Sequence, residues 1–200
     1  MNGLLLNQSL LKIKMEIKRC NWAKKNKLMI KYHDEEWGVP LHDDKKLFEF
    51  LVLETFQAGL SWDIILNKRE NFREAFDGFD IKKIKKYKDK EFNRLKNDEG
   101  IVRNGLKIKS TIINAQKFLD VQLEFGSFDK YIWRFTDNKI IRNRFENLKE
   151  IPSTSKESDE MSKDLKRRGF KFVGSKVCYA FMQACGMVDD HLVNCFRYQK

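Results

Sequence analysis

The chain has 200 residues, of which 42% are hydrophobic and 12% aromatic, and its formal net charge is +11. This length suits one ordinary domain with a sizeable core, and its 4 cysteines are too few for a disulfide scaffold. So basic a balance favours a polyanionic partner such as nucleic acid, because each neutralised phosphate releases counterions. A lysine-rich genome produces the same bias, so charge alone leaves the partner open.

The first residues have the features of neither a signal peptide nor a membrane span. Leu4 to Leu6 form an apolar patch, but basic residues between 12 and 19 interrupt the stretch after it, and no small-residue cleavage site appears. We therefore expect a cytoplasmic protein with reduced cysteines and no membrane partner. Residues 1–18 are interpreted as an N-terminal extension that is disordered or lies upstream of the natural start. Met15 is an equal candidate for that start, which would leave residues 1–14 as an extension without a role.

Apolar residues recur at helical spacing along most of the remaining chain, and only 2 prolines and 10 glycines interrupt it. The stretch from 138 to 156 is polar and is expected to be looped, and no segment alternates as a sheet does. The sequence therefore predicts an all-α fold. The expected helices begin after Asp43 or Asp44 and after Ser61, run through 72–76, 108–119 and 128–135, and occupy 158–168 and 175–185, with Gly169 and Gly186 as the C-terminal caps. A short lysine-rich segment of alternating Ile and Lys starts at Asp80.

Two cysteines and two histidines stand in pairs near the ends of the chain. His191 and Cys195 are four residues apart, so on a helix they would share one face and could hold one ion. Cys20 and His33 would reach that ion from a separate segment. Two thiolates and two imidazoles make a closed tetrahedral Zn2+ site of the structural kind. The alternative is that these are ordinary buried cysteines and surface histidines, because the short motif is weak alone.

Glu54 is the most informative acidic residue. Its spacing places it on the same helical face as Leu47, Phe50 and Leu51, so its carboxylate should point inward. A buried carboxylate without a partner costs roughly several kcal/mol, and such a group usually has a task. The alternative is a buried ion pair with a lysine or arginine.

Aromatic residues are dense around these positions, namely Trp22, Tyr32, Trp37 and Trp62. For any one of them, core packing is the simpler explanation. A cluster that flanks a buried acid instead favours a stacking pocket for a flat cationic ligand, in which each face-on contact contributes about 0.5 to 2 kcal/mol.

The segment Phe170-Lys171-Phe172-Val173-Gly174 leads into the last expected helix. A glycine at such a junction lets backbone N–H groups approach a phosphate, and a helix N-terminus favours the anion. Alone, this pattern is a weak signal and is more often only a turn.

Several distinctive strings of residues follow one another along nearly the whole chain, from residue 19 to residue 195. They contain the expected metal ligands, Glu54 and the junction before the last helix. The strings are Arg19-Cys20-Asn21-Trp22, Tyr32-His33-Asp34-Glu35-Glu36-Trp37-Gly38, Leu53-Glu54-Thr55-Phe56-Gln57-Ala58-Gly59-Leu60-Ser61-Trp62, Lys68-Arg69-Glu70-Asn71, Arg168-Gly169-Phe170-Lys171-Phe172-Val173-Gly174, Phe181-Met182-Gln183-Ala184-Cys185-Gly186 and Asp189-Asp190-His191. Together they resemble the bacterial 3-methyladenine DNA glycosylase I family.

The resemblance implies a helix-hairpin-helix DNA glycosylase fold, with a base pocket between two helical lobes, over residues 19–200. It also implies one structural Zn2+ that joins the N- and C-terminal segments. The ligands it implies are Cys20, His33, His191 and Cys195.

The resemblance also implies roles for the pocket residues. Glu54 falls on the family's pocket glutamate and becomes the catalytic residue. Tyr32 and Trp62 fall on base-contacting positions, and Trp22 and Trp37 on aromatic positions near the pocket.

The chain departs from the family pattern in one stretch. Lys27, Leu28 and Met29 stand where many relatives carry an Asp-Pro pair and a tyrosine, so one pocket aromatic is expected to be missing. Within the hairpin, Phe172 stands where the wider superfamily often has glycine.

The implied activity is that of a monofunctional DNA glycosylase, which flips out 3-methyladenine and hydrolyses it from alkylated double-stranded DNA in base excision repair. We expect a monomer that releases free 3-methyladenine. Lys171, Gly174 and Lys176 are the candidate DNA-binding residues, and Arg167 and Arg168 are further candidates for phosphate contacts.

Strand-cutting relatives place a nucleophilic lysine after the hairpin glycine and an aspartate after the next helix. Lys176 and Asp189 have a similar placement, but the interval from Gly174 to Asp189 is several residues shorter than in those relatives. We therefore expect hydrolysis without strand cleavage, with Asp189 orienting His191.

Two other functions compete with this one. A non-catalytic, zinc-stabilised nucleic-acid-binding protein explains the charge and the metal ligands but not an acid on an apolar helical face. A zinc hydrolase requires an open coordination position, which four protein ligands deny.

Overall fold

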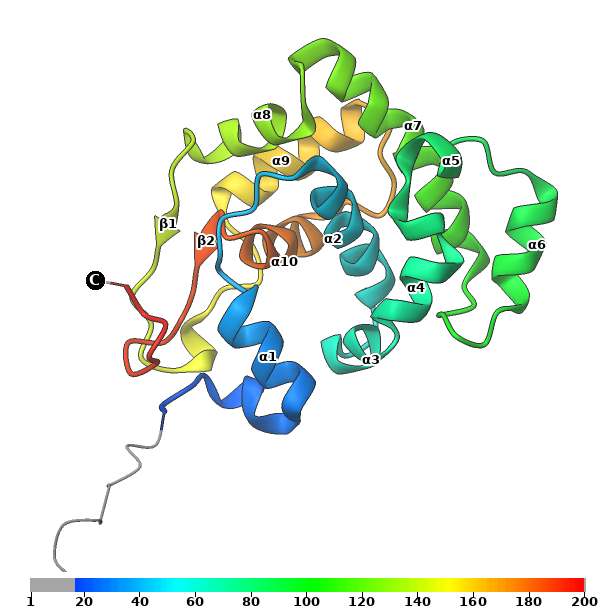
Figure 1. The fold of residues 1–200 in the computed structure, drawn as a ribbon. Helices are drawn as coiled ribbons and strands as arrows, with labels where there is room; N and C mark the ends of the chain where they lie inside the picture. The colour runs from blue at the N-terminus through cyan, green and yellow to red at the C-terminus, as the bar shows by residue number, and fades with distance from the viewer. Residues whose placement is uncertain (1–16, 200) are drawn as a thin grey trace, which may run out of the picture.

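The computed structural model describes residues 17–199, and this part of the chain is almost entirely helical (Figure 1). Nearly all of the N-terminal extension expected over residues 1–18 lies outside the described residues. The α-helices are α1 (Lys27–Glu35), α2 (Asp44–Gln57), α3 (Trp62–Asn67), α4 (Arg69–Ala75), α5 (Ile81–Ile84), α6 (Asp89–Asn97), α7 (Gly105–Phe125), α8 (Phe128–Trp133), α9 (Lys156–Arg167) and α10 (Ser175–Ala184). Short 3-10 helices are η1 (Asn21–Lys25), η2 (Asp77–Phe79), η3 (Arg134–Thr136) and η4 (Leu148–Glu150).

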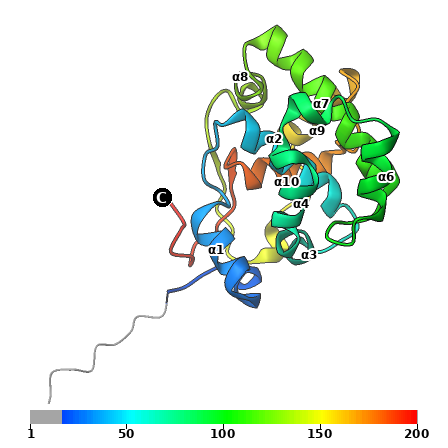
Figure 2. The same cartoon turned by 45° about the vertical axis from the view of Figure 1, so that its right-hand side comes forward.

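Helix α2 forms the centre of the core because it is buried on all sides. Every residue from Leu47 to Phe56 is buried, and the helix packs against α10, α7, α3 and α8. Figure 1 places α2 and α10 centrally, with α4, α6 and α7 to one side, and in the turned view of Figure 2 α6 remains at that edge. Asp43 caps the start of α2 through the backbone N–H of Lys46, as the sequence predicts.

The end of α2 is held by a buried lysine from α7. The ammonium of Lys107 donates to the carbonyl oxygens of Phe56 and Ala58 at 2.8 and 2.6 Å. These carbonyls belong to the last turn of the helix and lack helical partners. Burial lowers the pKa of Lys107, and its two carbonyl partners compensate the buried charge.

The expected helices match α2, α3, α4, α7, α8 and α10, whereas α1, α5 and α6 were not predicted. The start predicted for α9 at Ser158 is wrong, because Ser155 caps the helix and Ser158 lies in its first turn. The prediction without any sheet also missed a parallel pair, β1 (Ile141–Arg142) with β2 (Val188–Asp189). Strands of two residues are too short to show alternation.

The C-terminal segment of the described chain contacts its N-terminal end. The prediction that His191 and Cys195 share a helical face is wrong, because residues 190–199 form turns without helix. The backbone N–H of Phe196 donates to the carbonyl of Lys18 at 2.9 Å. The guanidinium of Arg19 lies 5.4 Å from the centre of the Phe196 ring.

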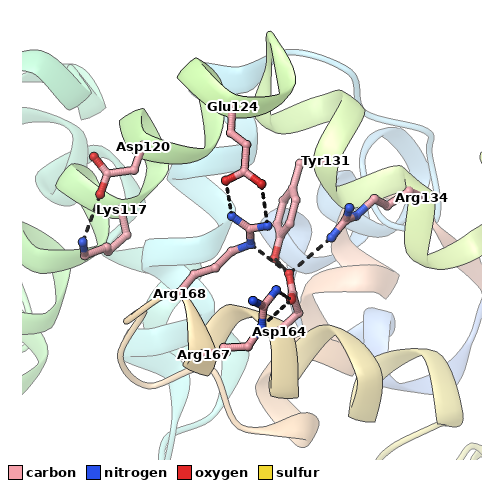
Figure 3. Close-up of polar contacts among 8 residues, drawn as sticks. All are labelled: Lys117, Asp120, Glu124, Tyr131, Arg134, Asp164, Arg167 and Arg168. Atoms are coloured by element: carbon pink, nitrogen blue, oxygen red, sulfur yellow. Dashed lines mark hydrogen bonds and ion pairs between the residues drawn. The ribbon is translucent and has the colours of Figure 1, made fainter.

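Helices α7, α8 and α9 are tied together by an ion network around Asp164 (Figure 3). Its carboxylate accepts from the hydroxyl of Tyr131 at 2.8 Å and from Arg168 Nε at 2.9 Å. Burial opposes ionisation, but hydrogen bonds from Arg167, Arg168 and Tyr131 hold the pKa of Asp164 at about 2. Arg168 also donates twice to Glu124, so its guanidinium is already occupied and is a poor candidate for phosphate.

None of the helices in residues 17–199 is long and apolar enough to cross a membrane.

Candidate functional site

A cavity of about 360 Å³ opens beside the central helix. Helix α2 contributes Glu54 and Gln57, and η1, α1, the turn after α1 and α3 contribute aromatic side chains to its wall. The loop around η4 and helix α10 supply the rest. The lining residues are Trp22, Tyr32, Trp37, Glu54, Gln57, Trp62, Leu148, Ile151, Ala180 and Gln183. All five residues expected to form a pocket therefore lie in one cavity of a size typical of ligand sites.

The aromatic walls of the cavity are held by edge-to-face and tilted ring contacts. The ring centres of Trp22 and Trp37 lie 5.0 Å apart at 76°, and those of Tyr32 and Trp62 lie 5.1 Å apart at 48°. Trp37 and Tyr32 are buried, at 7% and 3% exposure. Such contacts fix the ring positions and leave a cavity suited to a flat, apolar or cationic ligand.

Glu54 is a buried carboxyl group without a partner. Its side chain is 4% exposed, and its Oε2 forms no hydrogen bond with any residue of the described chain. Burial raises the pKa of Glu54 to about 8 because desolvation disfavours the charged form. The burial of Tyr32 itself, together with the nearby charge of Glu54, raises the pKa of Tyr32.

The ion pair considered as the alternative for Glu54 belongs to another residue. Glu49, also on α2 and 6% exposed, accepts from Arg69 at 2.6 Å and from Arg73 at 2.8 Å. Arg69 in turn donates to Glu36. Glu49 therefore has a structural explanation, and Glu54 does not.

A second polar atom in the cavity also lacks a partner within residues 17–199. The indole N–H of Trp62 is buried and forms no hydrogen bond there. Glu54 thus brings a buried acceptor without a partner to the cavity lining, and Trp62 a buried donor without a partner, among the described residues. Unpaired buried groups are uncommon in folded proteins and mark places where a ligand can complete the bonding.

Cys20, His33 and Cys195 form a cluster suited to a metal ion. One potential ligand atom from each lies within 4.8 Å of the others, and all three residues are buried. His33 Nε2 lies 3.4 Å from Cys195 Sγ. A hydrogen bond from Cys20 and a second from His33 lower the pKa of Cys195 to about 4. The bond between the two cysteines raises the pKa of Cys20. The structure therefore brings together three of the four expected ligands.

The fourth expected ligand, His191, lies beside this cluster. The ring centres of His191 and His33 are 5.0 Å apart, and the Nε2 atom of His191 is buried without a hydrogen-bond partner in the described chain. Its Nδ1 lies 2.7 Å from Asp189 Oδ1, the orienting contact that the sequence predicts. His33 Nδ1 makes the matching contact with Asp34 at 2.7 Å. Carboxylates placed in this way orient metal-binding imidazoles.

Glycine is required at position 38 by the same cluster. Gly38 has φ +72°, and an added Cβ would lie 2.8 Å from Cε1 of His191. A side chain there would displace the imidazole. The histidines in turn support the cavity wall, since ring centres lie 4.6 Å apart for Trp37 and His191 and 5.4 Å apart for Trp22 and His33.

A short segment of turns and bends connects α9 to α10. Asn114 of α7 clamps it, because its side chain accepts from the backbone N–H of Lys171 at 2.8 Å and donates to the Lys171 carbonyl at 3.0 Å. Phe172 adopts φ +55°, a conformation that costs a non-glycine residue roughly 1 to 2 kcal/mol. Lys171 and Lys176 are exposed, and Gly174 is half-buried. These three residues lie outside the cavity lining.

Comparison with known proteins gives a consistent result. The family model for methyladenine glycosylase matches residues 22–198. The DNA-3-methyladenine glycosylase 1 of Escherichia coli strain K12 is 46% identical over 182 residues, which cover 91% of this chain and 97% of that protein. A DNA-3-methyladenine glycosylase of Haemophilus influenzae is 43% identical over 177 residues, covering 88% of this chain and 96% of its own.

The chain belongs to the methyladenine glycosylase family.

Solved structures agree with this membership. A crystal structure of 3-methyladenine DNA glycosylase I superposes with a TM-score of 0.89 at 44% identity, covering 91% of this chain and all of the other, 100%. A second, described as a 3-methyladenine DNA glycosylase I in complex with 3-methyladenine, has a TM-score of 0.87 at 34% identity and covers 91% and 98%. The mostly helical fold predicted from the sequence is therefore that of the methyladenine glycosylases.

Sequence reasoning missed several lining residues of this family member. Gln57 and Gln183 belong to strings that carry the resemblance, so a signal for them was present but gave no role. Leu148 and Ile151 lie in the stretch treated only as a polar loop. Their apolar side chains line the cavity because η4 folds over it, and no local pattern reveals such a long-range contact.

Proposed function

We propose that this protein is a monofunctional DNA glycosylase that flips out 3-methyladenine and excises it hydrolytically from alkylated double-stranded DNA in base excision repair. Family membership and the named activities of the relatives support this function. The observation that carries it is the unpartnered carboxyl group of Glu54 inside an aromatic cavity.

The chemistry of the substrate fits the cavity. Methylation at N3 leaves adenine cationic, so the glycosidic bond is already weak and the enzyme must mainly select the base, place water and stabilise the sugar cation. Trp22, Tyr32, Trp37 and Trp62 supply ring faces and edges for the charged base. Flipping costs roughly a few kcal/mol and is easiest at a damaged pair.

Glu54 is proposed as the catalytic residue, recognising the donor edge of the base. Without a bound base its carboxyl group stays protonated up to a pH of about 8, the value to which burial raises its pKa. A cationic base in the cavity stabilises the carboxylate and lowers that pKa. Binding of the damaged base and ionisation of Glu54 then favour each other, whereas a neutral adenine provides no charge to drive ionisation.

One structural Zn2+ is proposed to join the ends of the chain. Cys20, His33 and Cys195 already converge, and the orphaned Nε2 of His191 supplies the fourth donor. Two thiolates and two imidazoles are a donor set typical of structural zinc. When bound, the ion supplies folding free energy and holds no open position for substrate.

The segment from α9 to α10 is proposed as the helix-hairpin-helix motif that binds the DNA backbone. Lys171 and Lys176 present exposed ammonium groups, and the backbone at Gly174 can approach a phosphate because it has no side chain. Contacts of this kind position the enzyme without reading sequence.

Base release from methylated duplex DNA tests the proposal against its rivals. We predict enzyme-dependent release of 3-methyladenine with the strand left intact. A non-catalytic nucleic-acid-binding protein would bind the duplex and release nothing. Trapping with borohydride tests the hydrolytic step: an adduct that disappears in Lys176→Ala would show a Schiff base and overturn the monofunctional assignment.

A further inference from the structure

Asp190 is a fully buried carboxylate that the proposed excision reaction does not use. It is 0% exposed and follows β2 directly. Its Oδ1 accepts from the side-chain amide of Asn143 at 2.7 Å. Its Oδ2 accepts from the hydroxyl of Tyr179 and from Nε2 of Gln183, each at 2.8 Å. All three donors are neutral side chains, and their hydrogen bonds fix the orientation of these groups as well as adding stability.

One of the three donors connects Asp190 to the cavity. Gln183 lies in the last turn of α10 and lines the cavity together with Glu54. A carboxylate can only accept, so the amide of Gln183 must turn its NH2 group toward Asp190. The amide oxygen is then the free end of the side chain, and it accepts no hydrogen bond from the described residues.

We propose that Asp190 is a positioning residue that fixes the amide of Gln183, and that Gln183 is thereby a specificity-determining acceptor for the bound base. This inference rests on the proposed base pocket. The exocyclic amino group of adenine offers two N–H donors. Glu54 accepts one and Gln183 accepts the other.

The arrangement discriminates against guanine as well as favouring adenine. Guanine carries the O6 acceptor where adenine carries the amino group. The acceptors of Glu54 and Gln183 would then face another acceptor and form no hydrogen bond with it. Buried polar groups left without partners in this way cost about 1 to 3 kcal/mol each. Without Asp190, the Gln183 amide can turn its NH2 group to the cavity and lose this preference.

Tyr179 provides a matched control because it shares the same carboxylate oxygen. Its hydroxyl donates to Oδ2 of Asp190, but Tyr179 does not line the cavity. Tyr179→Phe therefore removes one hydrogen bond from Asp190 and leaves the bond to Gln183 in place.

The test compares full-length Asp190→Asn, Gln183→Met, the double variant and Tyr179→Phe with the unaltered protein. Three quantities are measured: the Kd for free 3-methyladenine by tryptophan fluorescence, the release of 3-methyladenine relative to 3-methylguanine from alkylated DNA, and the Tm. Metal content is measured alongside, because His191 is adjacent to Asp190.

Gln183→Met is expected to raise the Kd by about tenfold, the equivalent of one hydrogen bond of about 1.4 kcal/mol. Asp190→Asn is expected to raise it by a similar factor and to increase relative release of 3-methylguanine. The Kd of the double variant is expected to be no higher than the higher Kd of the two single variants, because both substitutions abolish the same interaction. Tyr179→Phe is expected to lower the Tm and leave the Kd unchanged.

An Asp190→Asn protein with a lower Tm but unaltered Kd and base preference would show a purely structural role and overturn the inference. Additive effects in the double variant would do the same. If Asp190→Asn does not fold, Gln183→Met decides the matter, since an unchanged Kd and preference refute the acceptor role. If the unaltered protein neither binds nor releases 3-methyladenine, the proposed function fails first and the inference fails with it.

Discussion

Two carboxylates on α2 show how residues of the same type acquire different tasks. Glu49 is buried and paired with Arg69 and Arg73, whereas Oε2 of Glu54 is buried without a hydrogen-bond partner among residues 17–199. Helical spacing predicts that Glu54 points inward. It could not decide whether a cation meets it there, because the arginines come from α4 and the spacing of one helix contains no information about its neighbours.

Glu54→Gln is expected to preserve the fold and weaken recognition of 3-methyladenine. The amide offers one acceptor where the carboxylate offers two, and it cannot gain charge opposite a cationic base. Release of 3-methyladenine from methylated duplex and equilibrium binding of undamaged duplex check this, with the first slowed and the second retained. Equal release by both proteins would refute the pocket assignment.

The stability of the ligand-free protein should depend on pH through Glu54. Its folded-state pKa, raised to about 8 from an ordinary 4.5, means that the folded state holds this proton more tightly than the unfolded state does. The free energy of unfolding should therefore fall as pH rises from 4.5 to about 8 and then level off. The loss should be on the order of a few kcal/mol.

Denaturant unfolding of the unaltered protein and Glu54→Gln across this pH range measures the effect. The difference in unfolding free energy between them should change steadily with pH, in favour of the variant at alkaline pH. Parallel pH profiles would mean that Glu54 is ionised in the folded protein at neutral pH.

At the scale of elements, the segment that connects α9 to α10 depends on a distant helix. The sequence predicts a turn ending at Gly174 and the C-terminal glycine of α9. It does not reveal that Asn114 of α7, 57 residues away, clamps the turn through both polar atoms of the Lys171 backbone. The clamp helps to hold Phe172 in a left-handed conformation that the residue itself disfavours.

Lys171→Glu should flatten the salt dependence of binding to undamaged duplex. Each phosphate contact contributes about one unit to the slope of log K against log salt concentration, and a reversed charge removes at least one. Titrations at several salt concentrations measure the slope. Lys139→Glu, an exposed charge reversal just before β1, is the matched control and should change the slope less. Equal slopes for both variants would place the DNA surface elsewhere.

At the scale of the whole molecule, the first and last segments of the described chain meet at one cluster. The resemblance correctly indicated Cys20, His33 and Cys195 as neighbours. The helical spacing considered for His191 and Cys195 does not apply, because turns, with Leu192 and Cys195 buried, carry the chain back to Lys18. Helix periodicity predicted most of the core elements, but convergence of the two ends is a tertiary property that local spacing does not contain.

The purified protein should contain about one zinc per chain. Cys195→Ser should lose the metal and lower the Tm, and change excision by the molecules that remain folded much less. Metal analysis and thermal unfolding measure this. Cys178→Ser, at a buried cysteine outside the cluster, is the control and should lower the Tm while retaining the metal. A metal-free preparation of equal stability would refute the zinc tether.

The most direct measurement is single-turnover release of bases from duplex DNA that carries both 3-methyladenine and 7-methylguanine. Both bases are cationic, so charge alone does not separate them, and the shape and hydrogen-bonding groups of the pocket must. We predict rapid, enzyme-dependent release of 3-methyladenine, retention of 7-methylguanine and an uncut strand. Absence of 3-methyladenine release, or equal release of the two bases, would contradict the proposed function.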